Sequence, residues 1–319
     1  MSLDLDFKEL PKFTLSANEL RQYTDCPRKR YYASRDMLAI RSNAHQPALE
    51  LGSSVHGAFQ YYYTEIQKIL DERRIDRPEF EEVSEIYDNL PPYQLTTVLD
   101  GDNQKVFETI VSCYKDQLVQ DLCDYKILGC EKTFNLTNWP IPDVMYHGFI
   151  DMVVMDRDTG FVYFFEHKTC KDFRPAIYDR FDIQLHIYAQ YGVLEYGDSF
   201  GGMILNQVKK AKTERGYDSS RGTFTTDEEE LNDFFKWIKV KTEGIVSPNN
   251  MHEPCNNYMN CKMCEYADIC LKYGYKLPKS KEEIIDNPDF VIEEIDPETN
   301  ESVKVPQFKY EPRDSKEED

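Results

Sequence analysis

Asp151, Glu166 and Lys168 are the residues of this sequence with the clearest potential for chemistry. They belong to the stretch 145–168, in which two apolar runs flank a polar turn that ends in glycine. β-Branched and aromatic residues on both sides of such a turn predict a β-hairpin. Because side chains alternate across a strand, Glu166 and Lys168 share one face and His167 points to the other. Two carboxylates and an ammonium group in this arrangement can bind a divalent cation and polarise a water molecule beside it.

A second candidate centre is formed by cysteines near the end of the chain. Cys261, Cys264 and Cys270 follow the pattern C-x2-C-x5-C, and the sequence holds nine cysteines in all. An odd number in a chain without a secretory signal argues against a disulfide framework, so the cluster predicts a metal or iron–sulfur site. Three thiolates leave such a site one ligand short. Cys255 is the nearest candidate for the fourth ligand and Cys26 is the distant one, while free buried cysteines are the alternative interpretation.

The first helical pattern covers residues 15–34. It opens with a capping box made by Ser16 and Glu19, and the pattern is interrupted at Cys26-Pro27. A basic run follows, and its members are Arg28, Lys29 and Arg30. This run could contact nucleic acid, but taken alone the stretch favours a solvated helix with a buried cysteine.

Residues 48–73 and 77–127 also have mainly helical patterns. His56 lies in the first of these helices, where a lone histidine is more often a structural side chain than a ligand. Strand character begins at residues 126–136, which contain Glu131. That carboxylate is equally compatible with an edge-strand charge and with a role in a site.

After the hairpin, residues 175–195 predict a helix, and the spacing of Gln184 and Tyr188 places them on one of its faces. Residues 201–209 then predict a buried strand. This strand leads into the most basic local run in the second half of the chain, which contains Lys209 and Lys210.

The composition indicates a globular protein with a strongly acidic balance. The 319 residues have a formal net charge of −20, whereas generic nucleic-acid binders are basic. Residues 281–319 hold 14 acidic and 5 basic residues, a net of −9, and predict a solvated tail or a docking segment for a basic partner. A basic groove on the acidic body remains compatible with these numbers. No apolar run reaches the ~20 residues of a membrane span, and the N-terminus has no secretory pattern, so we expect an intracellular (cytoplasmic) protein.

Taken in order, these segments resemble the PD-(D/E)XK nuclease superfamily. The likeness is strongest to its RecB-like branch with a four-cysteine iron–sulfur cluster, which includes the AddB nuclease domain and the CRISPR-adaptation exonucleases. The resemblance covers most of residues 15–272. It is carried by Leu15–Leu20 with Cys26-Pro27, Gly52–His56, Gly148–Asp151, Glu166–Thr169, Gln184–Tyr188 and the cysteine trio. Ile150 stands where the family pattern has proline, and no G-x-x-x-x-G-K-[ST] occurs, so the chain carries no ATP-driven motor of its own.

The resemblance implies an α/β fold with a PD-(D/E)XK restriction-endonuclease-like core, in which helices flank a mixed central sheet. We expect a single RecB-like nuclease domain over residues 1–280 and an acidic C-terminal tail over 281–319. Within the domain, the helical insertion would span about 48–127 and the catalytic core about 128–245. An iron–sulfur staple would join the cysteine segment 255–272 to Cys26.

The resemblance also implies a role for each site residue. The ligands of Mg²⁺ or Mn²⁺ would be His56, Asp151, Glu166 and the backbone carbonyl of His167. Lys168 would orient or activate the attacking water, with support from Gln184 and Tyr188, whereas the His167 side chain would face away and tolerate change. A 4Fe–4S cluster would use Cys26, Cys261, Cys264 and Cys270, with Cys255 as a spare thiol and zinc as the alternative to the cluster.

The predicted function is a metal-dependent DNA nuclease, an exonuclease on single strands or DNA ends that hydrolyses phosphodiesters with a metal-activated water. Endonuclease action and an RNA substrate are also compatible with these motifs. The alternative is a catalytically silent nuclease-fold subunit of a DNA replication or recombination complex, docked through its acidic tail. The intact set of Asp151, Glu166 and Lys168 favours the enzyme.

Overall fold

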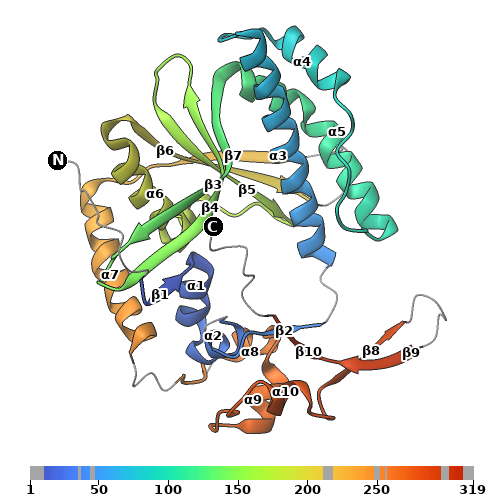
Figure 1. Ribbon diagram of the computed structural model, residues 1–319, viewed down its shortest axis with the longest axis vertical. Helices are drawn as coiled ribbons and strands as arrows, with labels where there is room; N and C mark the ends of the chain where they lie inside the picture. The colour runs from blue at the N-terminus through green and yellow to red at the C-terminus, as the bar shows by residue number, and fades with distance from the viewer. Residues whose placement is uncertain are drawn as a thin grey trace. The chain divides into compact units, whose positions relative to one another are not determined.

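The computed structural model describes residues 11–34, 37–43, 47–210, 218–247, 252–255, 257–295 and 302–311. The chain divides into two compact units (Figure 1). The first unit comprises Met1–Thr14 and Gln46–Lys236, and the second comprises Leu15–His45 and Trp237–Asp319.

A six-stranded mixed sheet is the centre of the first unit. Its order is β1-β4-β5-β6-β7, with β3 paired to β4, and only the β5–β6 pair of the four main ladders is parallel. The strands are β1 (Phe13–Leu15), β3 (Tyr125–Thr137), β4 (Val144–Asp156), β5 (Val162–Cys170), β6 (Phe200–Lys209) and β7 (Ser219–Phe224). The β4–β5 pair is the predicted hairpin.

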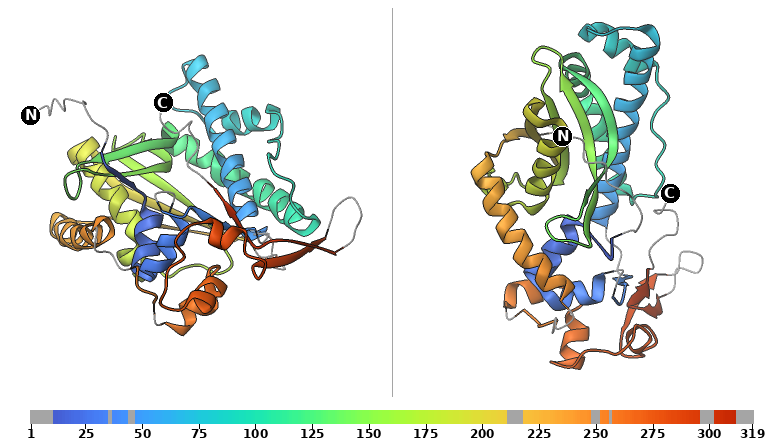
Figure 2. Two further views of the ribbon diagram at one scale, coloured as in Figure 1. Left: turned by 60° about the horizontal axis from the view of Figure 1, so that its bottom comes forward. Right: turned by 60° about the vertical axis from the view of Figure 1, so that its left-hand side comes forward.

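Helices cover both faces of this sheet (Figure 2). On one face, α3 (Pro47–Arg73), α4 (Phe80–Asn89) and α5 (Gly101–Asp124) share a continuous apolar core with the sheet, as the helical patterns of the sequence predict. On the other face lies α6 (Ile183–Tyr196), the crossover from β5 to the parallel strand β6. A short 3-10 helix, η1 (Ala176–Phe181), precedes it. The α/β architecture with a mixed sheet flanked by helices is therefore confirmed.

Local sequence signals explain where the helices near the site begin. Asp182 caps α6, because its carboxylate accepts hydrogen bonds from the backbone N–H groups of Gln184 and Leu185. Asp100 caps α5 in the same way. The cap fixes Gln184 in the first turn of α6, near the end of β5.

The second unit brings the N-terminal and C-terminal segments of the chain together. Strand β2 (Ile40–Ser42) pairs antiparallel with β10 (Phe308–Tyr310). The helices of this unit are α1 (Ala17–Asp25), α2 (Pro27–Ala33), α8 (Tyr258–Lys262), α9 (Ala267–Tyr273) and α10 (Glu282–Ile285). Aromatic residues that include Tyr32, Tyr266 and Phe308 form its core. The capping box of Ser16 and Glu19 is present.

The remaining elements complete the description. Helix α7 (Glu228–Val246) starts among residues of the first unit and ends among those of the second. A hairpin of β8 (Val291–Ile295) and β9 (Ser302–Pro306) forms within the segment 281–319, while the last residues, 312–319, lie outside the described part of the chain. None of the helices in the described ranges has the length and apolar character that crossing a membrane requires.

Candidate active site

The site lies where two strands of the sheet separate. Strands β4 and β5 are paired from Met155–Val162 to Met152–Phe165, and the ladder ends there. Asp151 and Glu166 are the next residue on each strand. The backbone N–H of His167 donates a 2.7 Å hydrogen bond to the Asp151 carboxylate, so a side chain takes the place of a strand partner. The sheet thus opens a fork that is lined by two carboxylates.

Glu131 enters the fork from β3 through an irregular backbone. It lies opposite Asp151, between regular pairs of the β3–β4 ladder, and its φ is 48°. Cys130 packs against the core under α3 and α5, whereas Lys132 reaches Tyr196 of α6 on the other face. In a regular strand, residues two apart share a face. Cys130 and Lys132 lie on opposite faces, so the alternation is interrupted at Glu131. A left-handed φ at a non-glycine residue is costly, and such strain is concentrated at functional sites.

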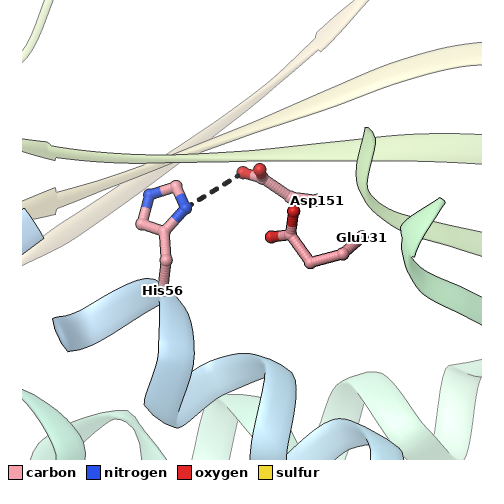
Figure 3. A group of neighbouring side chains, drawn as sticks. All are labelled: His56, Glu131 and Asp151. Carbon is pink, nitrogen blue, oxygen red and sulfur yellow. Dashed lines mark ion pairs between the residues drawn. The ribbon is translucent and has the colours of Figure 1, made fainter. Parts of the chain in front are cut away.

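His56, Glu131 and Asp151 form a candidate metal site (Figure 3). One ligand atom from each residue lies within 4.8 Å of those from the other two. Among the described residues, this is the one group of at least three His, Cys, Asp or Glu side chains whose ligand atoms lie this close together. His56 projects from α3 toward the two carboxylates, with its Nδ1 3.6 Å from Oδ2 of Asp151. The sequence is equally compatible with Glu131 as an edge-strand charge and as a site residue. The strand register places it in the site.

The charges of these three groups are balanced against one another. Burial alone would raise the pKa of Asp151, but the neighbouring His56 imidazole and the hydrogen bond from the His167 backbone lower it below its usual value. Burial would lower the pKa of His56, but the Asp151 and Glu166 carboxylates raise it. The pKa of Glu131 is raised, by burial first and by the Asp151 charge second. A cation among these groups would therefore relieve repulsion between carboxylates.

Glu166 carries the clearest sign of an absent partner. The residue is 1% exposed, and its Oε1 accepts hydrogen bonds from Lys168 Nζ and from Gln184 Nε2, the latter at 3.0 Å. Oε2 is buried and has no hydrogen-bond partner among the described residues. Burial first, and the Asp151 charge second, raise the pKa of Glu166 to about 7. Buried polar oxygens are nearly always satisfied, so this one fits a ligand that comes from outside the chain.

Lys168 is held at the mouth of the fork by a chain of hydrogen bonds. Its ammonium also contacts Gln184 Oε1 at 3.2 Å, while the side chain stays 43% exposed. Gln184 donates to the Tyr188 hydroxyl at 2.8 Å, and that hydroxyl donates to the carbonyl of Phe149 at 2.6 Å. The predicted shared face of Gln184 and Tyr188 is thus present, and together they tie α6 to β4. Lys168 can reach a solvent-borne substrate without losing its support.

The expectation that His167 tolerates change is wrong. Its side chain does point away from Lys168, but it is only 4% exposed and lies among Phe59, Tyr63 and Phe165. Its Nδ1 is 2.9 Å from the amide nitrogen of Asn206. The opposite face of the strand is a packed core and not solvent. The role of the His167 carbonyl as a metal ligand stays a prediction.

The predicted iron–sulfur cysteines are neighbours within the second unit. The backbone N–H of Cys255 donates to Cys26 Sγ at 3.3 Å, and the Sγ atoms of Cys255 and Cys261 are 3.8 Å apart. Cys264 and Cys270 pack against the aromatic core of that unit. All five are free thiols, and within the described ranges no three cysteine sulfurs lie within 4.8 Å of one another. The segments meet as the prediction requires, but the sulfurs do not converge on one point.

The predicted basic contacts are less available than the sequence indicates. Arg28 and Arg30 are each 2% exposed, and Arg28 donates to the backbone carbonyls of His252 and Tyr275. Two buried guanidinium groups cannot reach a phosphate from these positions. Lys29 is half-buried, Lys209 lies 3.6 Å from Asp218, and Lys210 donates to the carbonyl of Ala48.

A known protein family matches most of the chain. A model of the PD-(D/E)XK nuclease superfamily matches residues 14–271. A solved structure of a predicted exonuclease from Eubacterium rectale is similar in fold, with a TM-score of 0.51 and 13% identity over 85% of this chain and 92% of that one. The structure of SSO0001 aligns with a TM-score of 0.37 and 14% identity, over 85% of this chain and 89% of that one. No curated protein matches the sequence significantly. The match to the family model includes the fork, α6 and the cysteine segment, and the chain belongs to the PD-(D/E)XK nuclease superfamily.

Proposed function

We propose that this protein is a metal-dependent deoxyribonuclease that acts on single-stranded DNA or DNA ends. Membership of a nuclease superfamily implies a nucleic-acid substrate and phosphodiester hydrolysis. The observation that carries the proposal is the buried, unpartnered oxygen of Glu166 beside the group of His56, Glu131 and Asp151. Oxygen and imidazole ligands of this kind suit Mg²⁺ or Mn²⁺.

The residues of the fork would have separate roles in hydrolysis. His56, Asp151, Glu166 and Glu131 would hold the cation, which when bound supplies positive charge that activates water and stabilises the phosphoryl transition state. Lys168 orients the attacking water and donates to a phosphate oxygen. Gln184, locked by Tyr188, keeps the ammonium in place. The water oxygen bonds to phosphorus and gives up a proton, while the bond from phosphorus to the 3′ oxygen breaks and that oxygen takes up a proton. A 5′-phosphate and a 3′-hydroxyl result.

An uncovered aromatic side chain beside the fork supports a single-stranded substrate. Phe149 lies two residues before Asp151 and is 44% exposed, and its ring packs edge-on against His147 with a centroid distance of 5.2 Å. Unpaired bases stack on exposed aromatic side chains with little regard to sequence. With a formal net charge of −20, the protein must hold a polyanion through such local contacts and not through its overall field.

The test is Mn²⁺-dependent degradation of end-labelled single-stranded DNA. We expect wild type to release short products and Lys168→Ala to lose at least about 100-fold in rate, as is typical when a transition-state donor is removed. Lys115→Ala on α5, which breaks the ion pair with Asp88 of α4, is the matched control and should retain full activity. Separate labels at the 5′ and 3′ ends give the polarity, and duplex DNA and RNA give the substrate class. A wild-type protein that binds DNA but cleaves nothing with any divalent metal would sink the enzyme proposal in favour of a silent binding subunit.

We also propose that Cys26, Cys261, Cys264 and Cys270 hold a 4Fe–4S cluster. Support comes from the second unit, where segments from the two ends of the chain meet and bring free thiols together. A cluster bound by thiolates from both segments would link them. Anaerobically purified protein should be brown and contain iron and acid-labile sulfide. Colourless protein with stoichiometric zinc would replace the cluster with a zinc site.

A further inference from the structure

A buried polar network lies behind the fork, on the face of the sheet covered by α3 and α5. Arg221 of β7 forms a two-pronged ion pair with Asp121 of α5, and the Nη2–Oδ2 contact is 2.6 Å. Asp121 is 1% exposed. The Tyr63 hydroxyl also donates to Asp121, at 2.5 Å. Burying a charged pair in this position costs desolvation free energy. The groups that the pair orients are therefore of interest.

The ion pair fixes the orientation of a neighbouring amide. Nε of Arg221 donates to Oδ1 of Asn206 at 3.2 Å, and a guanidinium can only donate. The opposite end of the Asn206 amide must therefore be the NH₂ group. That group donates to the Tyr114 hydroxyl at 2.8 Å and lies 2.9 Å from Nδ1 of His167.

The amide in turn fixes the imidazole of His167. Because the Asn206 NH₂ group is a donor, Nδ1 of His167 must be the acceptor and the ring proton must lie on Nε2. The ring packs against Phe59 and Tyr63 of α3, at centroid distances of 5.2 and 6.1 Å. The position of this side chain is thus set by charge, by hydrogen bonding and by packing.

His167 is the residue between Glu166 and Lys168, and its own backbone N–H holds Asp151 at 2.7 Å. We propose that Arg221 and Asn206 are positioning residues for the metal site, acting through His167 on the main chain that aligns Asp151, Glu166 and Lys168. This inference rests on the proposed nuclease function. It assigns the network a role in metal affinity beyond the stability of the fold.

The test compares two variants that disturb the same network at different points. Asn206→Leu keeps a similar volume but removes the donor to His167. Tyr63→Phe is the control, because it removes a hydrogen bond to Asp121 and keeps the ring that packs on His167. For each protein we would measure the melting temperature, Mn²⁺ binding by calorimetry without DNA, and the Mn²⁺ and DNA dependence of cleavage.

We expect Asn206→Leu to weaken Mn²⁺ binding by about 10-fold or more, the usual effect of losing a group that orients a ligand, with the KM for DNA unchanged. Tyr63→Phe should lose stability yet bind Mn²⁺ as wild type does. Histidine ¹⁵N spectra should show Nδ1 of His167 unprotonated in wild type. If Asn206→Leu does not fold, Arg221→Lys, which keeps the charge opposite Asp121 but loses the contact with Asn206, should show the same loss to a smaller degree.

Wild-type Mn²⁺ affinity in a folded Asn206→Leu protein would overturn the inference, as would an equal loss in Tyr63→Phe. The binding measurement separates this result from the proposed function. A protein that binds Mn²⁺ through this network but cleaves no nucleic acid would support the positioning role and refute the nuclease. A protein that cleaves DNA and is unaffected by Asn206→Leu would support the nuclease and refute the positioning role.

Discussion

Glu166 combines two opposite environments in one carboxylate. Oε1 receives hydrogen bonds from Lys168 and Gln184, whereas Oε2 is buried without a donor in the described structure. An unsatisfied buried acceptor costs roughly 1–3 kcal/mol. At the scale of single residues, an additional positive partner would satisfy this oxygen, and its binding should stabilise the fork.

Glu131 is predicted to contribute to that binding. Glu131→Gln keeps the shape of the side chain but removes a charge from the group that it forms with His56 and Asp151. We expect the Mn²⁺ concentration for half-maximal activity to rise about 10-fold, with little change in the melting temperature. Glu195→Gln, at a half-exposed carboxylate 3.8 Å from Lys132, is the control. Wild-type metal dependence in Glu131→Gln would return this residue to the edge-charge interpretation.

At the scale of elements, the packing of β4 on its neighbours decides the position of Asp151. Gly148 precedes it by three residues, and a Cβ there would lie 2.7 Å from Cε1 of Phe134. Phe134 is buried and packs edge-on against Tyr188 at 5.2 Å. The glycine thus allows the close contact that ties β4 to α6.

Gly148→Ala should therefore destabilise the protein by about 1–3 kcal/mol, the usual cost of overpacking, and reduce activity through Tyr188. Urea unfolding and the cleavage rate measure the two effects. Gly129→Ala on the neighbouring strand would meet no heavy atom within 4 Å, and it should leave both nearly unchanged. A neutral Gly148→Ala would contradict this role for the glycine.

The environment of His167 predicts a pH dependence of stability. Burial lowers the pKa of His167 to about 3, whereas the unfolded chain protonates this side chain near ~6.5. Between these values the unfolded state binds more protons, so this contribution to stability is complete above about pH 6.5 and is lost as the pH falls. The loss approaches about 1.4 kcal/mol per pH unit. In urea unfolding between pH 5 and 7, His167→Leu should be less stable at neutral pH but show a smaller slope, and an unchanged slope would contradict the assignment.

Local features of this site are predictable from the sequence, whereas features that depend on distant segments are not. The alternation of β5 and the helical spacing of Gln184 and Tyr188 are local patterns, and both are found in the structure. The place of Glu131 depends on register across two strands and on one left-handed residue, which no local pattern reports. The burial of His167 depends on α3 and α5 covering the far face of the strand. The alternation of a strand predicts the direction of a side chain but not whether that face is packed core or solvent.

At the scale of the whole molecule, the second unit depends on both ends of the chain. The pairing of β2 with β10 and the aromatic core of Tyr32, Tyr266 and Phe308 join segments far apart in sequence. Such long-range contacts are expensive to form, because the intervening chain must be closed into a loop. A metal centre at the cysteines would offset part of that cost.

Loss of the proposed cluster should therefore loosen the second unit more than the first. We expect Cys264→Ser to speed hydrogen exchange in α1, α2 and α9 while the sheet of the first unit stays protected. Cys113→Ser, at an exposed cysteine on α5, is the matched control. Equal protection of the second unit in wild type and Cys264→Ser would argue against a structural centre at these thiols.

The fork between β4 and β5 has a further consequence. Beyond Phe165, β5 keeps its parallel partner β6 but has lost β4, so on that side it is an edge strand. Free strand edges template pairing with other chains, and a charged group directed at the edge is a common protection. The Asp151 carboxylate occupies the backbone N–H of His167 and serves this purpose in addition to its proposed role in metal binding. Asp151→Ala, the obvious inactive variant, would uncover the edge and promote aggregation, whereas Asp151→Asn keeps an oxygen for that N–H group and is the better inactive protein for binding studies.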